Sequence, residues 1–377
     1  MINIRKLFEP TDMTVGTPWK SIALFSVPML IGNIAQQLYS TVDSIVVGHY
    51  VGDNALASVG SAAPLFNMLL VLFVGISAGV GIMVSQYFGA KAREELSHTI
   101  GTCITMTALV SLVLMLVAPP FIRSMLSALN TPASILDDCT AYLKILMYGI
   151  AGMAYYNILS GILRGMGDSR RPFLFIAIAA LLNIVLDIVL VAGCGMEVFG
   201  AALATVISQA GSFVVSLIYL YRRKESFGFD FRLKSFRIES VALKPLVALG
   251  IPMAIQSAAI SLSKIVLMSW INLFGVVYSA LAGVYNKINV MIGIVSNSFT
   301  AAGSTMVGQN LGAKQYERVP KILKTVGVCS ILISTVFTIC IVCFQDSVYQ
   351  LFTSDEAVLE NAYILLIPII LNFYGSA

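Results

Sequence analysis

The chain has 377 residues, of which 58% are apolar and 11% are charged, and its mean hydropathy is +0.88. A soluble domain carries about 25% charged residues, so this chain could not cover a folded core with a wetted surface. The composition excludes an ordinary soluble enzyme or binding domain. It predicts an all-α protein that crosses a membrane many times.

Apolar runs of about 20 residues, long enough to cross a hydrocarbon core as helices, recur along the chain. We place nine such runs and the start of a tenth at 21–47, 60–84, 100–118, 141–163, 173–193, 199–221, 246–271, 278–303, 322–344 and 360–377. No charged-then-apolar leader with a small-residue cleavage site precedes the first run, so we expect no removable signal peptide.

The basic residues follow the loops between these spans. Of the 23 Lys and Arg residues, 19 lie in residues 1–20 or in alternate loops, and one, Arg123, lies in the opposite set. Cytoplasmic loops are the ones enriched in Lys and Arg. The pattern predicts a multi-pass protein of the cytoplasmic (inner) membrane with a cytoplasmic N-terminus. It also explains the net charge of +4 without a nucleic-acid partner.

A short motif occurs twice in the chain. "VSQYFGAK" at 84–91 resembles "VGQNLGAK" at 307–314, an offset of 223 residues, and three weaker matches occur in the same order at similar offsets. These are Pro28-Met29 with Pro252-Met253, "ALASV" (55–59) with "ALAGV" (280–284), and "AYL" (141–143) with "AYI" (362–364). Because six spans separate the copies, both enter the membrane from the same side, as parallel repeats do.

The repeat defines the expected domains. After a cytoplasmic N-terminus (1–20), an N-lobe of six spans (21–221) is joined by a basic cytoplasmic linker (222–244) to a C-lobe (245–377). A second copy of equal length would run to about residue 445. We therefore expect two pseudo-symmetric six-helix lobes with the second truncated, so that about 10 of 12 helices are present.

Two acidic residues stand out because they lie within spans. Of the 19 acids, only Asp43 and Asp187 lie away from the ends of a span, and an intramembrane carboxylate indicates function by default because it is costly there. Asn183 is four residues from Asp187 and so shares its helix face. Oxygen-rich side chains suit a hard cation, and such carboxylates can also exchange protons. A hydrogen-bonded pair that only fixes helix packing is the alternative.

The acid of the first span belongs to a longer polar stripe. Asn33, Gln36, Gln37, Ser40 and Ser44 recur three to four residues apart with Asp43. Such a stripe should line a wet cavity rather than face lipid.

Long stretches in order resemble the multidrug and toxic compound extrusion (MATE) transporters: "YSTVDSIVVGHYVGDNALASVG" (39–60), "GILRGMGDSRRP" (161–172), "NIVLDIVLVAGCGMEVFGAALATVISQ" (183–209) and the two "GAK" segments. The resemblance implies two six-helix lobes that alternate access to a central cavity and exchange a drug for Na⁺ or H⁺. We expect cationic or amphiphilic drugs and the lipid bilayer as partners, a monomer, and no cofactor or metal beyond the coupling ion.

The resemblance also assigns residues. It implies a cation site of Asp43, Asn183, Asp187 and Thr205, and a bending role for Pro28 in the first span. Candidates for lining the cavity are Asn33, Gln36, Gln37, Tyr39, Ser40, Lys264 and Asn286. The C-lobe spans offer no acid, only Lys264 and Lys287, so members with a C-lobe coupling carboxylate do not match this chain.

Two other functions remain as alternatives. A lipid-linked oligosaccharide flippase of the same superfamily would favour a cavity rich in Arg and Lys, whereas two aspartates against two lysines favour the exporter. A membrane enzyme such as a prenyl transferase needs Asp-rich metal motifs at helix ends. The adjacent acids Asp137-Asp138 and Asp355-Glu356 fall in short loops, so we do not expect an enzyme.

Overall fold

The computed structural model describes residues 12–129, 131–350 and 359–375, and within these ranges the chain is helical throughout, without a strand. Eight of the described helices are long and apolar enough to cross a membrane, or nine when one bent pair is counted as a single span. The expected polytopic all-α fold is confirmed. Its first part consists of α1 (Pro18–Tyr50), α2 (Asp53–Gly89), α3 (Arg93–Ala128), α4 (Leu136–Tyr148), α5 (Ile150–Gly165), α6 (Arg170–Asp187), the π-helix η2 (Ile188–Gly193) and α7 (Glu197–Arg222).

Two short helical turns follow, α8 (Lys224–Phe227) and the 3₁₀ turn η3 (Leu233–Phe236). The second part then consists of α9 (Ser240–Ile271), η4 (Asn272–Phe274), α10 (Val276–Gly312), η5 (Tyr316–Arg318), α11 (Val319–Cys343), α12 (Gln345–Gln350), η6 (Ala362–Leu365) and α14 (Leu366–Gly375).

The helices run beyond the spans expected from hydropathy. The third span, expected at 100–118, is the 36-residue helix α3, and the second and eighth are 37 residues each. Hydropathy marks only the apolar middle of a helix, whereas the backbone hydrogen bonds continue into its polar ends. The tenth span, expected at 360–377, is a shorter apolar helix at Ala362–Asn372, and residues 376–377 lie outside the described residues.

The fourth span is broken rather than continuous. α4 and α5 meet at Gly149 with a bend of 51°. A Cβ at Gly149 would collide with the side chain of Val206, and one at Gly152 would lie 3.1 Å from the backbone of Ala210. The two glycines therefore let α5 pack closely against α7, and the chain bends where that close packing begins.

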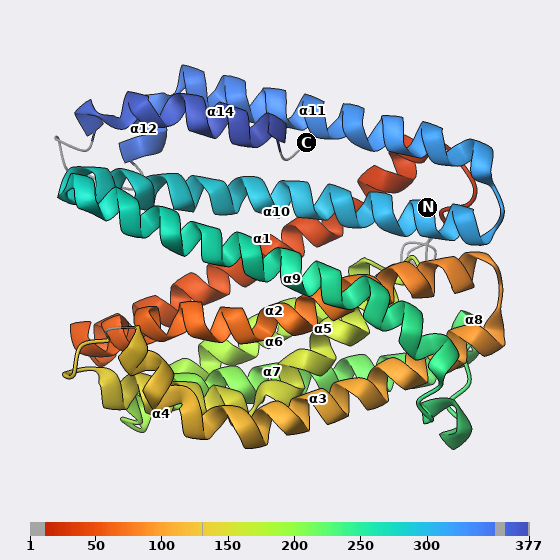
Figure 1. The fold of residues 1–377 in the computed structure, drawn as a ribbon, viewed down its shortest axis with the longest axis horizontal. Coiled ribbons are helices and arrows are strands. Elements are labelled where there is room, and N and C mark those ends of the chain that lie inside the picture. The colour runs from red at the N-terminus through yellow and green to blue at the C-terminus, as the bar shows by residue number, and fades with distance from the viewer. Residues whose placement is uncertain (1–11, 130, 351–358, 376–377) are drawn as a thin grey trace.

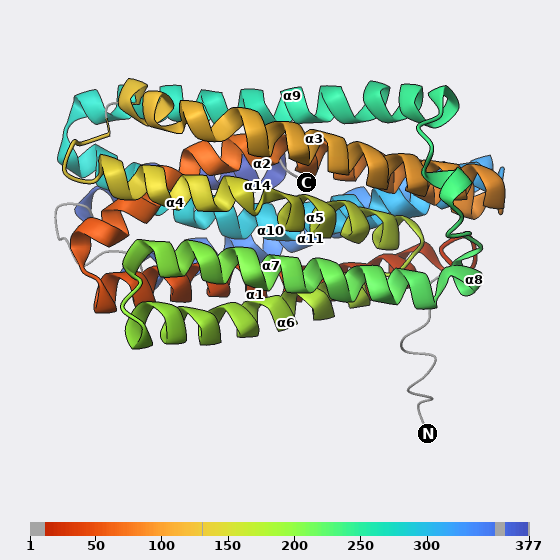
Figure 2. The same ribbon diagram turned by 90° about the horizontal axis from the view of Figure 1, so that it is seen from below.

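Two groups of helices lie side by side. In Figure 1, α2 to α7 lie on one side, α10, α11 and α14 lie on the other, and α1 and α9 pass between them. Figure 2, turned by 90°, shows α1 and α9 toward opposite faces of the bundle. α1 packs against α6 and α10, while α9 packs mainly against α2 and also contacts α10, so each crossing helix contacts helices of both groups.

The sequence repeat reappears in the backbone. α2 and α10 are both 37 residues long, and α10 begins and ends 223 residues after α2. Each follows a glycine with positive φ, Gly52 or Gly275, and each is followed within two residues by a lysine in the left-handed region, Lys91 or Lys314. The match of "ALASV" with "ALAGV", at an offset of 225, is two residues out of this register.

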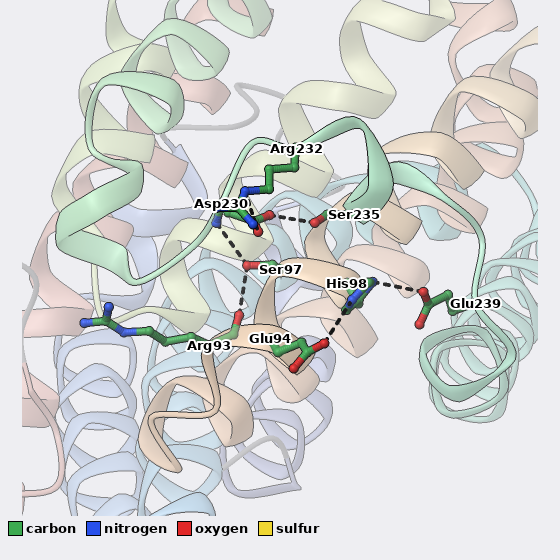
Figure 3. Close-up of polar contacts among 8 residues, drawn as sticks. All are labelled: Arg93, Glu94, Ser97, His98, Asp230, Arg232, Ser235 and Glu239. Carbon is green, nitrogen blue, oxygen red and sulfur yellow. Dashed lines mark hydrogen bonds and ion pairs between the residues drawn. The ribbon is translucent and has the colours of Figure 1, made fainter.

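The linker is folded against α3. Ser97 accepts a hydrogen bond from the Asp230 N–H (3.0 Å), and Ser235 donates to the Asp230 carboxylate at 2.6 Å (Figure 3). Further along α3, Thr105 donates to the Phe236 carbonyl at 2.7 Å. α9 begins at Ser240, so Lys244, which was expected in the linker, lies in this helix.

A histidine fastens the end of this linker. His98 on α3 contacts Glu239 at 3.2 Å and Glu94 at 3.9 Å (Figure 3). The linker is thus bound to the first group of helices from residue 230 to the residue before α9.

Candidate functional site

The intramembrane acids come from two helices that pack together. Asp43 lies in α1, and Asn183 and Asp187 lie in α6. The spacing of four places Asn183 and Asp187 one turn apart, and both are fully buried, as expected for one helix face. Asp43 is 7% exposed and Thr205, on α7, is 6% exposed. The structure thus brings all four residues of the expected cation site into one buried region.

Electrostatic and hydrogen-bonding contacts join these four residues. Asp43 and Asp187 are close enough to interact electrostatically across the α1–α6 interface. The amide of Asn183 satisfies both its neighbours in one orientation, which we assign from the hydrogen bonds. It then donates to Asp187 Oδ2 at 2.8 Å and accepts from the Thr205 N–H at 3.2 Å. The amide therefore orients one carboxylate and ties it to α7.

One oxygen of each carboxylate is buried without a hydrogen bond from the described residues. Within the described chain, Oδ1 of Asp43 and Oδ1 of Asp187 are buried and have no hydrogen-bond partner. A buried charged oxygen without a partner costs several kcal/mol or more. A cation or a proton bound between the two carboxylates would offset that cost, because it supplies the missing positive charge or donor.

The helix that carries two of these residues changes its winding beside them. α6 ends at Asp187, and the next six residues, Ile188–Gly193, form the π-helix η2. π-turns occur frequently at functional sites because the wider turn shifts side chains out of the regular α-helical register. Here the change occurs at the residue whose carboxylate faces α1.

Two tyrosines complete the surroundings of the acids. The Tyr39 hydroxyl interacts with the Thr205 side chain, so this residue, expected to line the cavity, belongs to the acid cluster. Tyr142 from α4 is buried and close enough to interact electrostatically with Asp43 and Asp187. No pattern in the sequence marks Tyr142 beyond its place in the "AYL" repeat, because a tyrosine in an apolar run is common.

The polar stripe of α1 is more open. Gln36, Gln37 and Ser40 are exposed, whereas Asn33 is half-buried and donates to the Ser298 hydroxyl of α10 at 3.2 Å. Asn33 thus joins the two groups of helices. The cavity hypothesis for Gln36, Gln37 and Ser40 stays a prediction.

The other expected residues lie apart from the acids. α1 continues as one helix through Pro28. Lys264 on α9 and Asn286 on α10 are both exposed. Among the described residues, no hydrogen bond joins either of them to the four residues of the acid cluster.

Metal-type clusters are also missing from the described part of the chain. No group of three or more His, Cys, Asp or Glu side chains is placed to hold a metal ion there. The six cysteines are free thiols.

Long apolar helices in two packed groups, with paired acids buried between spanning helices, define a polytopic membrane protein of the transporter class. The family model described as MatE matches residues 28–189 and again 252–377, once in each expected lobe. The chain belongs to the MATE family, a family of membrane transporters and not of enzymes.

Individual relatives agree with this assignment. The chain is 31% identical over 366 residues to a probable multidrug resistance protein, YoeA, of Bacillus subtilis, covering 95% of this chain and 79% of that one. A crystal structure of MATE in complex with MaD3S has the same fold, with a TM-score of 0.89 at 23% identity over 98% of this chain and 83% of that one. An outward-facing multidrug resistance MATE family transporter gives 0.85 at 22% identity, covering 98% and 86%.

Proposed function

We propose that this protein exports cationic or amphiphilic drugs in exchange for Na⁺ or H⁺ by alternating access. The observation that carries the proposal is the buried pair Asp43 and Asp187, each with one carboxylate oxygen that lacks a hydrogen-bond partner. Drugs as the substrate class are supported by the relative YoeA, whose description is that of a probable multidrug resistance protein.

The cluster can couple two movements because its charge must be compensated. Asp43 and Asp187 hold the ion, Asn183 orients Asp187, and Thr205 supplies a neutral oxygen. Since Asp43 and Asp187 lie on different helices, ion binding draws α1 toward α6, and ion loss leaves two like charges facing each other. The position of α1 against α10, where Asn33 meets Ser298, is then sensitive to the bound ion.

Transport in proteoliposomes tests the proposal directly. A fluorescent organic cation should move against its gradient when a Na⁺ or a pH gradient is imposed in the opposite direction. Asp187→Asn should abolish this, whereas Asp137→Asn, which changes an exposed acid paired with Arg123, should not. Ion-independent translocation of a lipid-linked oligosaccharide, with no movement of organic cations, would instead establish the flippase.

The proposed topology has its own test. The loop bias of basic residues places the linker in the cytoplasm and the α3–α4 turn outside. A membrane-impermeant thiol reagent applied to intact cells should label Leu129→Cys but not Lys234→Cys, both in a background without native cysteines. Labelling of Lys234→Cys but not of Leu129→Cys would show that the topology is the reverse of the one proposed.

A further inference from the structure

The two copies of the repeated motif contact each other. They end α2 and α10 at the same end of the bundle, which we call the motif end. A Cβ at Gly89, in the sixth position of the first copy, would lie 2.7 Å from the carbonyl carbon of Gln309, in the third position of the second. A Cβ at Gly312 would lie 2.8 Å from the carbonyl carbon of Gln86. Each sixth-position glycine therefore packs on the third-position glutamine of the other copy.

The contact is symmetric at a further position. The second residues of the two copies, Ser85 and Gly308, face each other, and a Cβ at Gly308 would lie 3.0 Å from the Ser85 Cβ. Where the same motif position of two copies contacts itself, the two-fold axis that relates the copies passes through that contact. The repeats therefore meet on their pseudo-symmetry axis, at a distance that only glycine permits.

An N-terminal segment is fixed onto this contact from one side. The Gln309 side chain accepts a hydrogen bond from the Met13 N–H and donates to the Gly165 carbonyl of α5, both at 3.0 Å. Asn310 donates to the Met13 carbonyl, also at 3.0 Å. Both amide side chains are 0% exposed. Two buried amides thus satisfy both polar groups of one backbone residue.

The segment around Met13 is held by its side chain and by a charge as well. Met13 is fully buried in a cluster with Phe25 of α1, Met306 of α10 and Ile322 of α11. Arg318 donates to the Gly16 carbonyl at 3.0 Å. Residues 13–16, which lead into α1, are therefore bound mainly by α10, η5 and α11.

We propose that the two motif copies and residues 13–16 form a latch, which joins the two groups of helices at the motif end and must separate for that end to open. The proposal rests on the proposed function, which makes this the cytoplasmic end of an alternating-access transporter. Gln309 is the central positioning residue because it touches α2, α5 and residue 13 together. Gln86, its counterpart in the first copy, is only partly buried, so the latch is asymmetric.

Distances between spin labels in purified, reconstituted protein test the latch. One pair, Glu95→Cys with Lys321→Cys, reports on the motif end from α3 and α11, and both positions are exposed. A second pair, Leu129→Cys with Leu273→Cys, reports on the opposite end, where both side chains are also exposed. The six native cysteines are replaced in this background.

Two substitutions disturb the latch in different ways. Gly312→Ala introduces the collision, whereas Gln309→Ala only removes two hydrogen bonds and is the variant less prone to misfolding. Gly293→Ala is the matched control, because Gly293 lies on the same helix as Gly312 but a Cβ there would meet nothing within 4 Å. We expect Gln309→Ala to lower the ratio of closed to open molecules at the motif end roughly five- to tenfold, with distances at the opposite end becoming shorter.

Three results would contradict the latch. The proposal is overturned if Gln309→Ala leaves the motif-end distances unchanged, or if they lengthen with no change at the opposite end, since the latter means local unfolding. It is also overturned if Gly293→Ala acts as Gly312→Ala does. Because the measurement uses neither drug nor ion gradient, an absence of drug transport would leave its result unaffected.

Discussion

Neutralising either acid of the α1–α6 pair should remove ion binding without unfolding the protein. In Asp43→Asn or Asp187→Asn, one buried carboxylate is lost and the shape of the side chain is kept. Removing one partner from a buried ionic arrangement costs about 3–5 kcal/mol, which corresponds to a loss of ion affinity on the order of 10²- to 10⁴-fold. Since the bound ion needs both carboxylates, the double variant should be no worse than either single one.

Thermal unfolding at constant ionic strength measures this effect. If Na⁺ is the ion, a concentration 100 times Kd stabilises the wild type by about 2.7 kcal/mol, whereas a variant that binds 100-fold more weakly gains about 0.4 kcal/mol. If H⁺ is the ion, Na⁺ has no specific effect on the wild type, and the pH profile of transport changes in the variants instead. Full ion-dependent transport by Asp187→Asn would refute the reasoning and leave the pair as a packing contact.

Three further outcomes follow from local geometry. Asn183→Ala and Thr205→Ala each remove a neutral group, so ion affinity should fall only about five- to tenfold, as measured by the same titration. Asp168→Ala removes the carboxylate that pairs with Arg171 at 2.8 Å in a buried position, and should lower the free energy of unfolding by about 3–5 kcal/mol while ion dependence persists; unchanged stability would contradict it. Lys314→Gly should raise stability by about 0.5–1 kcal/mol because glycine adopts the positive φ of this position (58°) without strain, and a lower melting temperature would be the opposing result.

The spans could be predicted because a helix that crosses a membrane needs a run of about 20 apolar residues. Helix ends could not, since polar residues such as Arg93 continue a helix without raising its hydropathy. The bend at Gly149 and the π-helix after Asp187 also escaped prediction. Both depend on how closely neighbouring helices approach, and no local pattern of residues records that distance.

Some residues of the candidate site could also be predicted from the sequence, whereas their contacts could not. Asp43 and Asp187 could be singled out from their position in apolar runs, and Asn183 from its spacing, because polar groups there are costly. Thr205 was assigned from the family resemblance alone. That Tyr39 meets Thr205, or that Gly89 meets Gln309, depends on which helices become neighbours. The repeat was visible in the sequence, but the contact between its two copies was not.

The linker bound to α3 limits how the two groups of helices can move apart. Thr102 holds the Arg237 carbonyl at 3.4 Å, His98 contacts Glu239 at 3.2 Å, and α9 begins at Ser240. Even if the Glu239 contact breaks, the chain from residue 237 to residue 240 can extend only about 10 Å, at about 3.5 Å per residue. The start of α9 can therefore pivot about the start of α3 but cannot slide along it by more than about two helical turns.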